Sequence, residues 1–210
     1  MNPAQASGSE QSAYLMWLPP AAERALCISY GGHVAASVRE RLAQHVASDP
    51  KSLADSGPLD VAFLIGHPAA GRLDDSREAM ADYLGTVAKT WAMLKPSGKL
   101  IIALDPSRVP GGVTRSVLAW LNPRTWLEAR AIGNAVGRLG AADVVRLHVF
   151  PSVWRPVLMQ ILESPTVLKR LALSHTGGWR AGRAVSLLVR GGPMSAIDLF
   201  PAGIVWIASR

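Results

Sequence analysis

The sequence has 210 residues, of which 49% are apolar and 18% are charged, and its formal net charge is +7. That length suits one domain with a well-buried core, and the apolar content excludes an intrinsically disordered protein. The single cysteine, Cys27, excludes an intrachain disulfide and a cysteine-based metal site, and it suits the reducing cytoplasm.

The N-terminus and the distribution of charge set further limits. Residues 1–13 are polar and small, which predicts a disordered tail rather than a signal peptide. No apolar run approaches the roughly 20 residues that cross a bilayer, so we expect no transmembrane segment. Residues 106–210 hold 13 Lys/Arg against 4 Asp/Glu, which indicates an anionic partner or simply a solvated basic face. We expect no nucleic acid, because no motif for binding it is present.

The first elements along the chain are a short strand and a helix. Residues 26–30 form an apolar run that predicts a buried strand. Gly31-Gly32 follows it, and residues 34–44 have the apolar spacing of a helix. Residues 45–48 are a possible second strand.

The middle of the chain gives the clearest pattern. Residues 59–65 are an apolar run typical of a strand that is buried on both faces. A helix with apolar residues at three- and four-residue steps follows and runs to position 94, after which Pro96-Ser97-Gly98 stops it. Residues 99–104 predict another buried strand.

The last part begins with a helix over 126–139 and an alternating strand over 144–150. Residues 151–200 are predicted to form a basic helical insertion, or cap, before a final strand at 202–208. Strands that alternate with helices predict a single α/β domain over residues 1–210. We expect a Rossmann-like, mostly parallel sheet with helices on both faces, whose ligands bind beyond the carboxyl ends of the strands.

The middle and the end of the chain also carry a recognisable order of motifs. The strand DVAFLIGH begins with an aspartate, a long helix follows, and LKPSG precedes the strand KLIIAL. The segments VVRLHVFPS and DLFPAGIVWIASR read as a final pair of strands. This order resembles the class I S-adenosylmethionine-dependent methyltransferase family, in which the turn before that strand has the form leucine-lysine-proline-glycine-glycine. The resemblance covers roughly residues 25–150 and the last dozen.

The resemblance implies S-adenosylmethionine as the cofactor. A glycine loop after the first strand would let the backbone approach the methionine part of the cofactor closely. Asp49 would hold either the ribose or the adenine, or it is only a turn cap before Pro50. The expected cofactor contacts are Tyr30, Gly31, Gly32, Asp49 and Gly66.

Two histidines are candidate catalytic residues. His67 follows Gly66 at a strand end, where a side chain with a pKa of about 6.5 could take a proton from a hydroxyl or amine acceptor. His33 could play the same part or cap the next helix, and His67 could instead be a loop histidine bonded to backbone. The five histidines are scattered without ligand spacing, so we expect no metal.

The cofactor half is shorter than the family pattern. Asp60 follows Asp49 by only 11 positions, too few for the helix and strand that the family places there, so one βα unit is expected to be missing. The sheet edge left open would pair with another protein or with a second copy, as a dimer.

Two functions follow from these observations. The first is transfer of a methyl group from S-adenosylmethionine to a small or amphiphilic acceptor, with the arginines of residues 151–200 suited to an anionic one. The alternative is a catalytically silent accessory or scaffold subunit with the methyltransferase fold.

Overall fold

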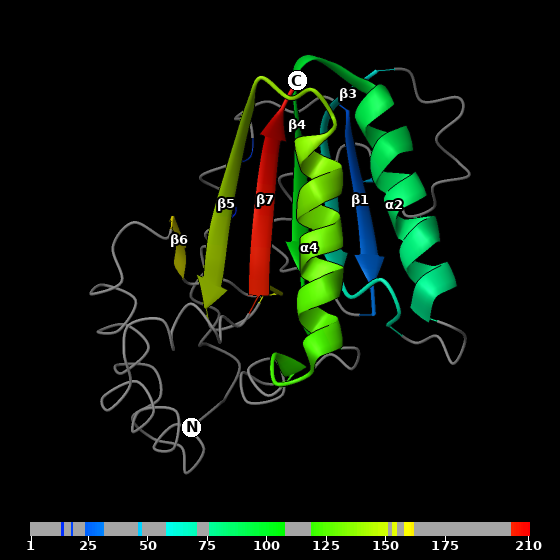
Figure 1. The fold of residues 1–210 in the computed structure, drawn as a ribbon. Coiled ribbons are helices and arrows are strands. Elements are labelled where there is room, and N and C mark those ends of the chain that lie inside the picture. Colours follow the sequence, from blue (N-terminus) through cyan, green and yellow to red (C-terminus); the bar gives the residue numbers. More distant parts are fainter. Residues whose placement is uncertain are drawn as a thin grey trace, which may run out of the picture.

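The computed structural model describes Tyr14, Leu18 and residues 24–31, 46–47, 58–70, 76–107, 119–150, 153–154, 158–161 and 203–210. These residues contain seven strands and two helices: β1 Ala25–Tyr30, β2 Val46–Ala47, β3 Leu59–Gly66, α2 Ser76–Ala92, β4 Leu94–Leu104, α4 Pro123–Gly137, β5 Asp143–Phe150, β6 Leu158–Ile161 and β7 Gly203–Ser209 (Figure 1). No helix in this part of the chain is long and apolar enough to span a membrane.

The strands form one open sheet in the order β2-β1-β3-β4-β7-β5-β6. The pairs β2–β1, β1–β3 and β3–β4 are parallel, whereas β7 runs antiparallel to both β4 and β5, and β6 is antiparallel to β5. The predicted α/β fold is therefore confirmed, but the sheet, which was predicted to be mostly parallel, is mixed, with three parallel and three antiparallel pairs. Of the described strands β2 stands at one edge, where it pairs with β1 alone.

Two apolar layers explain why the central strands have no polar face. Leu64 and Ile102 belong to the layer under the helices, while Phe63 and Ile101 belong to the layer on the opposite face. All four side chains are fully buried. Because neighbouring residues of a strand point to opposite faces, a strand segment covered on both sides must be apolar throughout, as residues 61–65 of β3 and 100–104 of β4 are.

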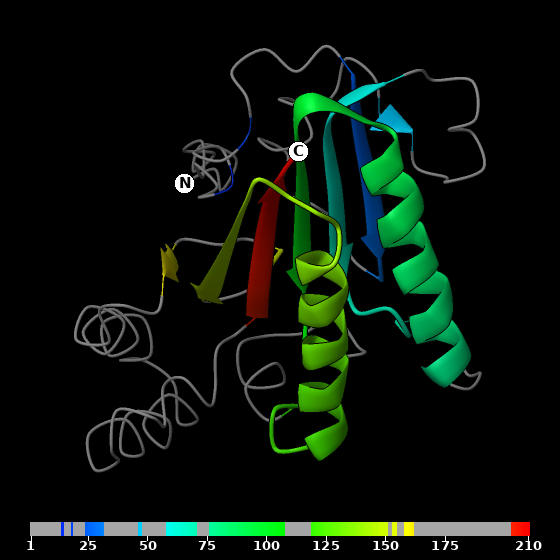
Figure 2. The same cartoon turned by 45° about the horizontal axis from the view of Figure 1, so that its top comes forward.

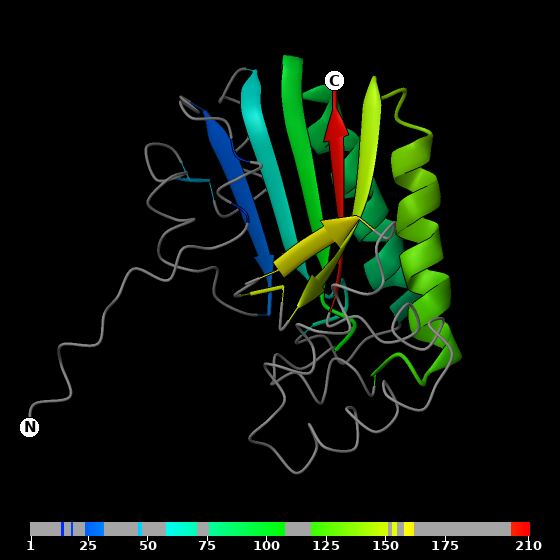
Figure 3. The same ribbon diagram turned by 90° about the vertical axis from the view of Figure 1, so that its left-hand side faces the viewer.

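Both described helices lie on the same face of the sheet (Figures 2 and 3). Val87 and Trp91 of α2 and Ile132 and Val136 of α4 pack there against the sheet. On the other face, Tyr14, Leu18, Val153 and Trp154 join the second apolar layer. The helix predicted over 34–44 lies outside the described residues, and cover of both faces by helices stays a prediction.

The motif LKPSG forms an irregular start to β4 rather than a turn before the strand. Leu59 pairs with Leu94 but Val61 pairs with Lys99, so the register shifts between these pairs. Ser97 takes a left-handed φ of 69°, and Lys95 Nζ lies 2.7 Å from Asp60 Oδ1. The prediction that the strand begins at residue 99 was five residues too late, because the segment keeps its pairing with β3 across the bulge.

Arg210 ties this segment to the end of α2. Its guanidinium donates hydrogen bonds to the carbonyls of Trp91, Ala92 and Leu94. Carbonyls at the end of a helix lack partners within the helix, and a cation favours the negative end of the helix dipole. Arg210 therefore caps α2.

Two further predictions need correction. Helix α4 begins at Pro123, three residues before the predicted start at 126, because Asn122 caps it: its side-chain oxygen accepts a hydrogen bond from Arg124 N. Residues 158–161, predicted as part of a helical cap, form the strand β6 against β5. The rest of the 151–200 segment, apart from residues 153–154, and the predicted tail 1–13 lie outside the described residues.

Candidate functional site

The ends of three parallel strands meet at one edge of the sheet, the lower edge in Figure 1. Tyr30 ends β1 and pairs with Gly66 at the end of β3. His67 follows β3, and Asp105 follows β4. The backbone N–H of Asp105 donates to the Gly66 carbonyl oxygen at 3.4 Å. The structure therefore brings together the predicted residues Tyr30, Gly31, Gly66 and His67.

Gly66 is required by close packing at this edge. Its φ is +113°, and a Cβ on it would lie 2.1 Å from the Tyr30 carbonyl oxygen and 2.9 Å from Cη2 of Trp154. No other residue type fits that backbone conformation and that space. Gly66 was predicted as a cofactor contact; its described neighbours on this side are the protein's own Tyr30 and Trp154.

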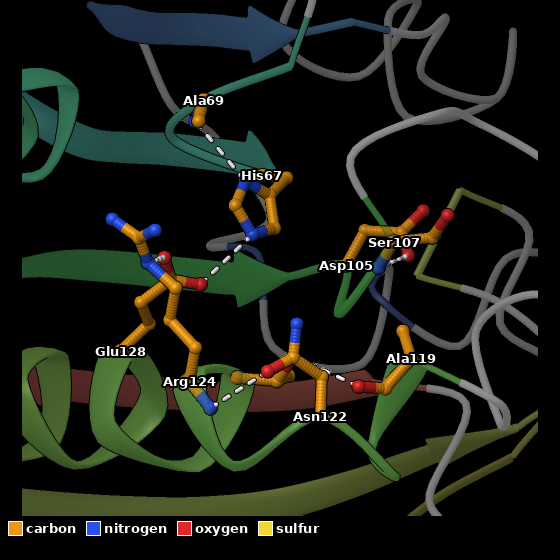
Figure 4. A network of polar contacts seen from close by, with 9 residues as sticks. His67, Ala69, Asp105, Ser107, Ala119, Asn122, Arg124 and Glu128 are labelled. Carbon is orange, nitrogen blue, oxygen red and sulfur yellow. Dashed lines mark hydrogen bonds and ion pairs between the residues drawn. The ribbon is translucent and has the colours of Figure 1, made fainter. Parts of the chain in front are cut away.

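His67 has hydrogen bonds at both ring nitrogens. Nδ1 accepts the backbone N–H of Ala69 at 3.0 Å, so in the neutral ring the proton sits on Nε2. Nε2 then donates to Oε2 of Glu128 at 3.1 Å (Figure 4). The His67 side chain is 2% exposed. In this arrangement neither nitrogen has a lone pair available to an incoming acceptor.

Glu128 joins His67 to helix α4. Its Oε1 lies 3.5 Å from Nε of Arg124, one turn earlier on the helix, and its side chain is 10% exposed. Thr125 donates its hydroxyl hydrogen to the Ala119 carbonyl at 2.8 Å, which fixes the turn before the helix. Figure 4 shows the carboxylate pointing across the sheet edge toward His67. The result is a chain of contacts from Arg124 through Glu128 to His67.

Asp105 is a second buried carboxylate at the same edge, 1% exposed. Oδ1 accepts the backbone N–H of Ser107 at 2.9 Å, and Oδ2 accepts the indole N–H of Trp154 at 2.7 Å. Burial, and then the nearby Asp105 carboxylate, raise the pKa of Tyr14 well above 10. The Tyr14 hydroxyl donates to the Val153 carbonyl at 2.8 Å, so this tyrosine is a neutral donor.

The end of β1 is more open than the ends of β3 and β4. Ser29 and Gly31 are exposed and Tyr30 is half-buried. Gly31 has a φ of +88°, the conformation in which glycine turns the chain without strain. The Tyr30 ring stands edge-on to Tyr83 of α2, with centroids 5.0 Å apart. Burial raises the pKa of Tyr83 well above 10, and its hydroxyl has no hydrogen-bond partner among the described residues.

The remaining candidates fall outside this edge. Gly32, His33 and Asp49 lie outside the described residues, so their predicted roles stay predictions. His148 is buried on β5, and both of its ring nitrogens lack hydrogen-bond partners in the described part of the chain. Burial, and then Arg146, lower the pKa of His148 to about 4.

Arg124 and Glu128 were not predicted as site residues, whereas Asp105 follows one of the strand ends where ligands were expected. Glu128 gives one signal in the sequence, since it is the only acidic residue of α4 and falls among the apolar positions that bury the helix. Residues 76–107, 119–150 and the other described ranges hold no group of three or more His, Cys, Asp or Glu able to bind a metal.

Chemically, the edge offers two buried carboxylates and one oriented histidine, all with their hydrogen bonds made within the protein. For His67 to act as a general base, Nδ1 would first have to give up its hydrogen bond from the Ala69 N–H. It could then take the proton of the molecule that accepts the methyl group. Comparison of the sequence with protein-family models gave no match, and comparison with curated proteins gave none.

Proposed function

We propose that the chain is a class I methyltransferase-like protein that binds S-adenosylmethionine at the carboxyl end of β1. The final strand supports the proposal: β7 is reversed and lies beside β5, which suits the final pair of strands that the resemblance implies. The short link between β2 and β3 fits the family sheet with one βα unit removed.

The observation that carries the proposal is Gly31. It is exposed, it follows a buried parallel strand directly, and it has a positive φ of 88°. A backbone without a Cβ at that place lets a ligand approach the end of the strand, which is where ligands bind in open α/β sheets. Tyr30 and Gly31 would hold the methionine part of the cofactor, and Gly32 and Asp49 are the further expected contacts.

When bound, S-adenosylmethionine supplies an electrophilic methyl group. The chain would contribute alignment of the acceptor, exclusion of water and a place for the acceptor proton. His67 is the candidate for that proton, with Glu128 as the residue that orients its ring. The arginines of residues 106–210 suit an anionic or amphiphilic acceptor. A cytoplasmic location is part of this proposal.

A second candidate function is a catalytically silent scaffold subunit. The observation that favours it is the closed state of the β3 and β4 ends: His67 and Asp105 have their hydrogen bonds satisfied, and Trp154 lies against Gly66. A protein of this kind would use the fold for pairing, with a second copy or another protein, at the β2 edge.

Calorimetric titration with S-adenosylmethionine, and with S-adenosylhomocysteine as a second ligand, separates the two functions. Binding by the wild type, lost in Gly31→Trp, is the expected result. Gly140→Trp is the matched control. Gly140 is also exposed and has a positive φ of 69°, but it precedes β5, at the opposite ends of the strands from Gly31. No heat and no thermal shift at about millimolar ligand would reject the methyltransferase proposal. A cofactor-insensitive dimer in light scattering would then support the scaffold.

A further inference from the structure

The N-terminal end of α4 exposes leucines to solvent. Leu127, on the first turns of the helix, is 65% exposed, and Leu121, in the turn before it, is 64% exposed. Among the described residues, the one other large apolar side chain with high exposure is Val144, at 41%. The two most exposed large apolar side chains of the described residues therefore lie six residues apart, at the start of α4.

The outer face of α4 continues from Leu127 as a polar and basic stripe. Arg130, Asn134 and Arg138 follow Leu127 at steps of three or four residues, so the four residues share one side of the helix. All four are exposed. The opposite side carries the buried residues Thr125, Glu128, Ala129, Ile132 and Val136.

This face has cations but no carboxylate. The only acidic residue of α4 is Glu128, which is buried and directed at His67. Arg124 also lies near the face but contacts Glu128, so the positive charge of the stripe comes from Arg130 and Arg138. The same sign prevails over residues 106–210, with 13 Lys/Arg against 4 Asp/Glu. The complementary partner is therefore anionic and offers an apolar layer for leucines.

We propose that the outer face of α4, together with the turn before it, docks on an anionic lipid bilayer, with the helix along the surface and Leu121 and Leu127 inserted below the headgroups. A basic helix face with apolar side chains binds lipid interfaces in this way. A protein partner fits less well: a stable interface needs about 800 Å² on each side around a buried apolar centre, and this convex face offers two separate leucines. The inference stands apart from the proposed methyltransferase function.

Co-sedimentation of the full chain with lipid vesicles tests the proposal. We expect binding to phosphatidylcholine vesicles that contain about one third phosphatidylglycerol, and at least about tenfold weaker binding to phosphatidylcholine alone. Raising the salt concentration should weaken the binding, since charge interactions at a surface are screened. The double variants L121S/L127S and R130Q/R138Q should each bind about tenfold more weakly, and the second should lose most of the salt dependence.

Matched controls come from other faces of the molecule. Val144→Ser removes an exposed apolar side chain from β5, and Lys89→Gln removes an exposed cation from α2. Both should bind vesicles within about twofold of the wild type. Circular dichroism and melting curves establish that each variant is folded.

Three results would overturn the proposal. They are no binding to the anionic vesicles, equal binding to both kinds of vesicle, and wild-type binding by L121S/L127S. Binding to polyglutamate without binding to vesicles would also reject the bilayer and assign the face to an acidic protein.

Discussion

His67 and Glu128 join the end of β3 to the first turns of α4 through a hydrogen bond of 3.1 Å between Nε2 and Oε2. Both side chains are buried, and the other ring nitrogen of His67 accepts the Ala69 N–H. Loss of either partner leaves a buried polar group with an unmade hydrogen bond, which is costly in a protein interior.

The pair should therefore show strong energetic coupling. We expect a double-mutant cycle of His67→Ala and Glu128→Ala to give an interaction free energy of about 1–3 kcal/mol in urea unfolding. Glu128→Gln keeps an acceptor for Nε2–H and should cost less than Glu128→Ala. If the two alanine substitutions are additive, the hydrogen bond contributes nothing to stability.

Gly66 should tolerate no side chain. Gly66→Ala places a Cβ 2.1 Å from the Tyr30 carbonyl oxygen at a φ of +113°, so we expect the free energy of unfolding to fall by about 3 kcal/mol or more. Gly85→Ala is the control: this glycine lies within α2, its added Cβ meets nothing within 4 Å, and the variant should gain about 0.5–1 kcal/mol. Urea denaturation measures both. Equal effects of the two substitutions would contradict the packing around Gly66.

Ser97 is the residue in the LKPSG segment whose backbone is strained. A left-handed conformation costs a residue with a Cβ about 1–2 kcal/mol. Glycine avoids this cost, but it loses more conformational entropy on folding, which offsets part of the gain in stability. Ser97→Gly, which gives the segment two adjacent glycines, should raise the free energy of unfolding by about 0.5–1 kcal/mol.

The neighbouring glycine provides the opposite case. Gly98→Ala would place a Cβ 2.9 Å from the Lys95 carbonyl oxygen and 3.1 Å from that of Leu59, and it should destabilise the protein in the same assay. A loss of stability in Ser97→Gly would show that the strain at φ 69° is not significant.

His148 should make the protein sensitive to acid. Its pKa is about 4 in the folded chain and about 6.5 when unfolded, so the unfolded state binds a proton first as the pH falls. The contribution of this histidine is complete above about pH 6.5 and is lost between there and about pH 4, a change of about 3 kcal/mol.

His148→Leu removes both the titration and the two unsatisfied nitrogens. The difference in melting temperature between the variant and the wild type should grow in favour of the variant as the pH falls through that window. Parallel curves for the two proteins would show that His148 does not titrate between the two values.

The sequence predicts the centre of the fold well because those elements are decided locally. Every buried position of β3 and β4 is apolar, on both faces of the sheet, and α2 has an apolar stripe at helical spacing. The start of α4 was missed because the capping pair Asn122-Pro123 is a signal of only two residues. The apolar spacing by which the helix was predicted begins later. Four-residue β6 has no period of its own, and its pairing with β5 defines it.

The candidate site was predicted only in part, because its contacts join distant parts of the chain. His67 could be singled out by its place at a strand end, but Glu128 lies 61 residues away and meets it only when α4 packs on the sheet. Trp154 and Asp105 are 49 residues apart, and nothing local in either segment predicts their hydrogen bond. Gly66 was read as a place for a ligand, whereas the close approach of Tyr30 and Trp154 also requires glycine there.

The position of β7 has a consequence for how the chain folds. β4 and β5 do not pair with one another; each pairs with β7, the last of the described strands. The two halves of the sheet therefore stay separate until a segment from the far end of the sequence inserts between them. Non-local pairings of this kind slow folding, and they leave the edges of β4 and β5 exposed to wrong partners in the meantime. We expect aggregation of refolding intermediates to compete with the insertion of β7.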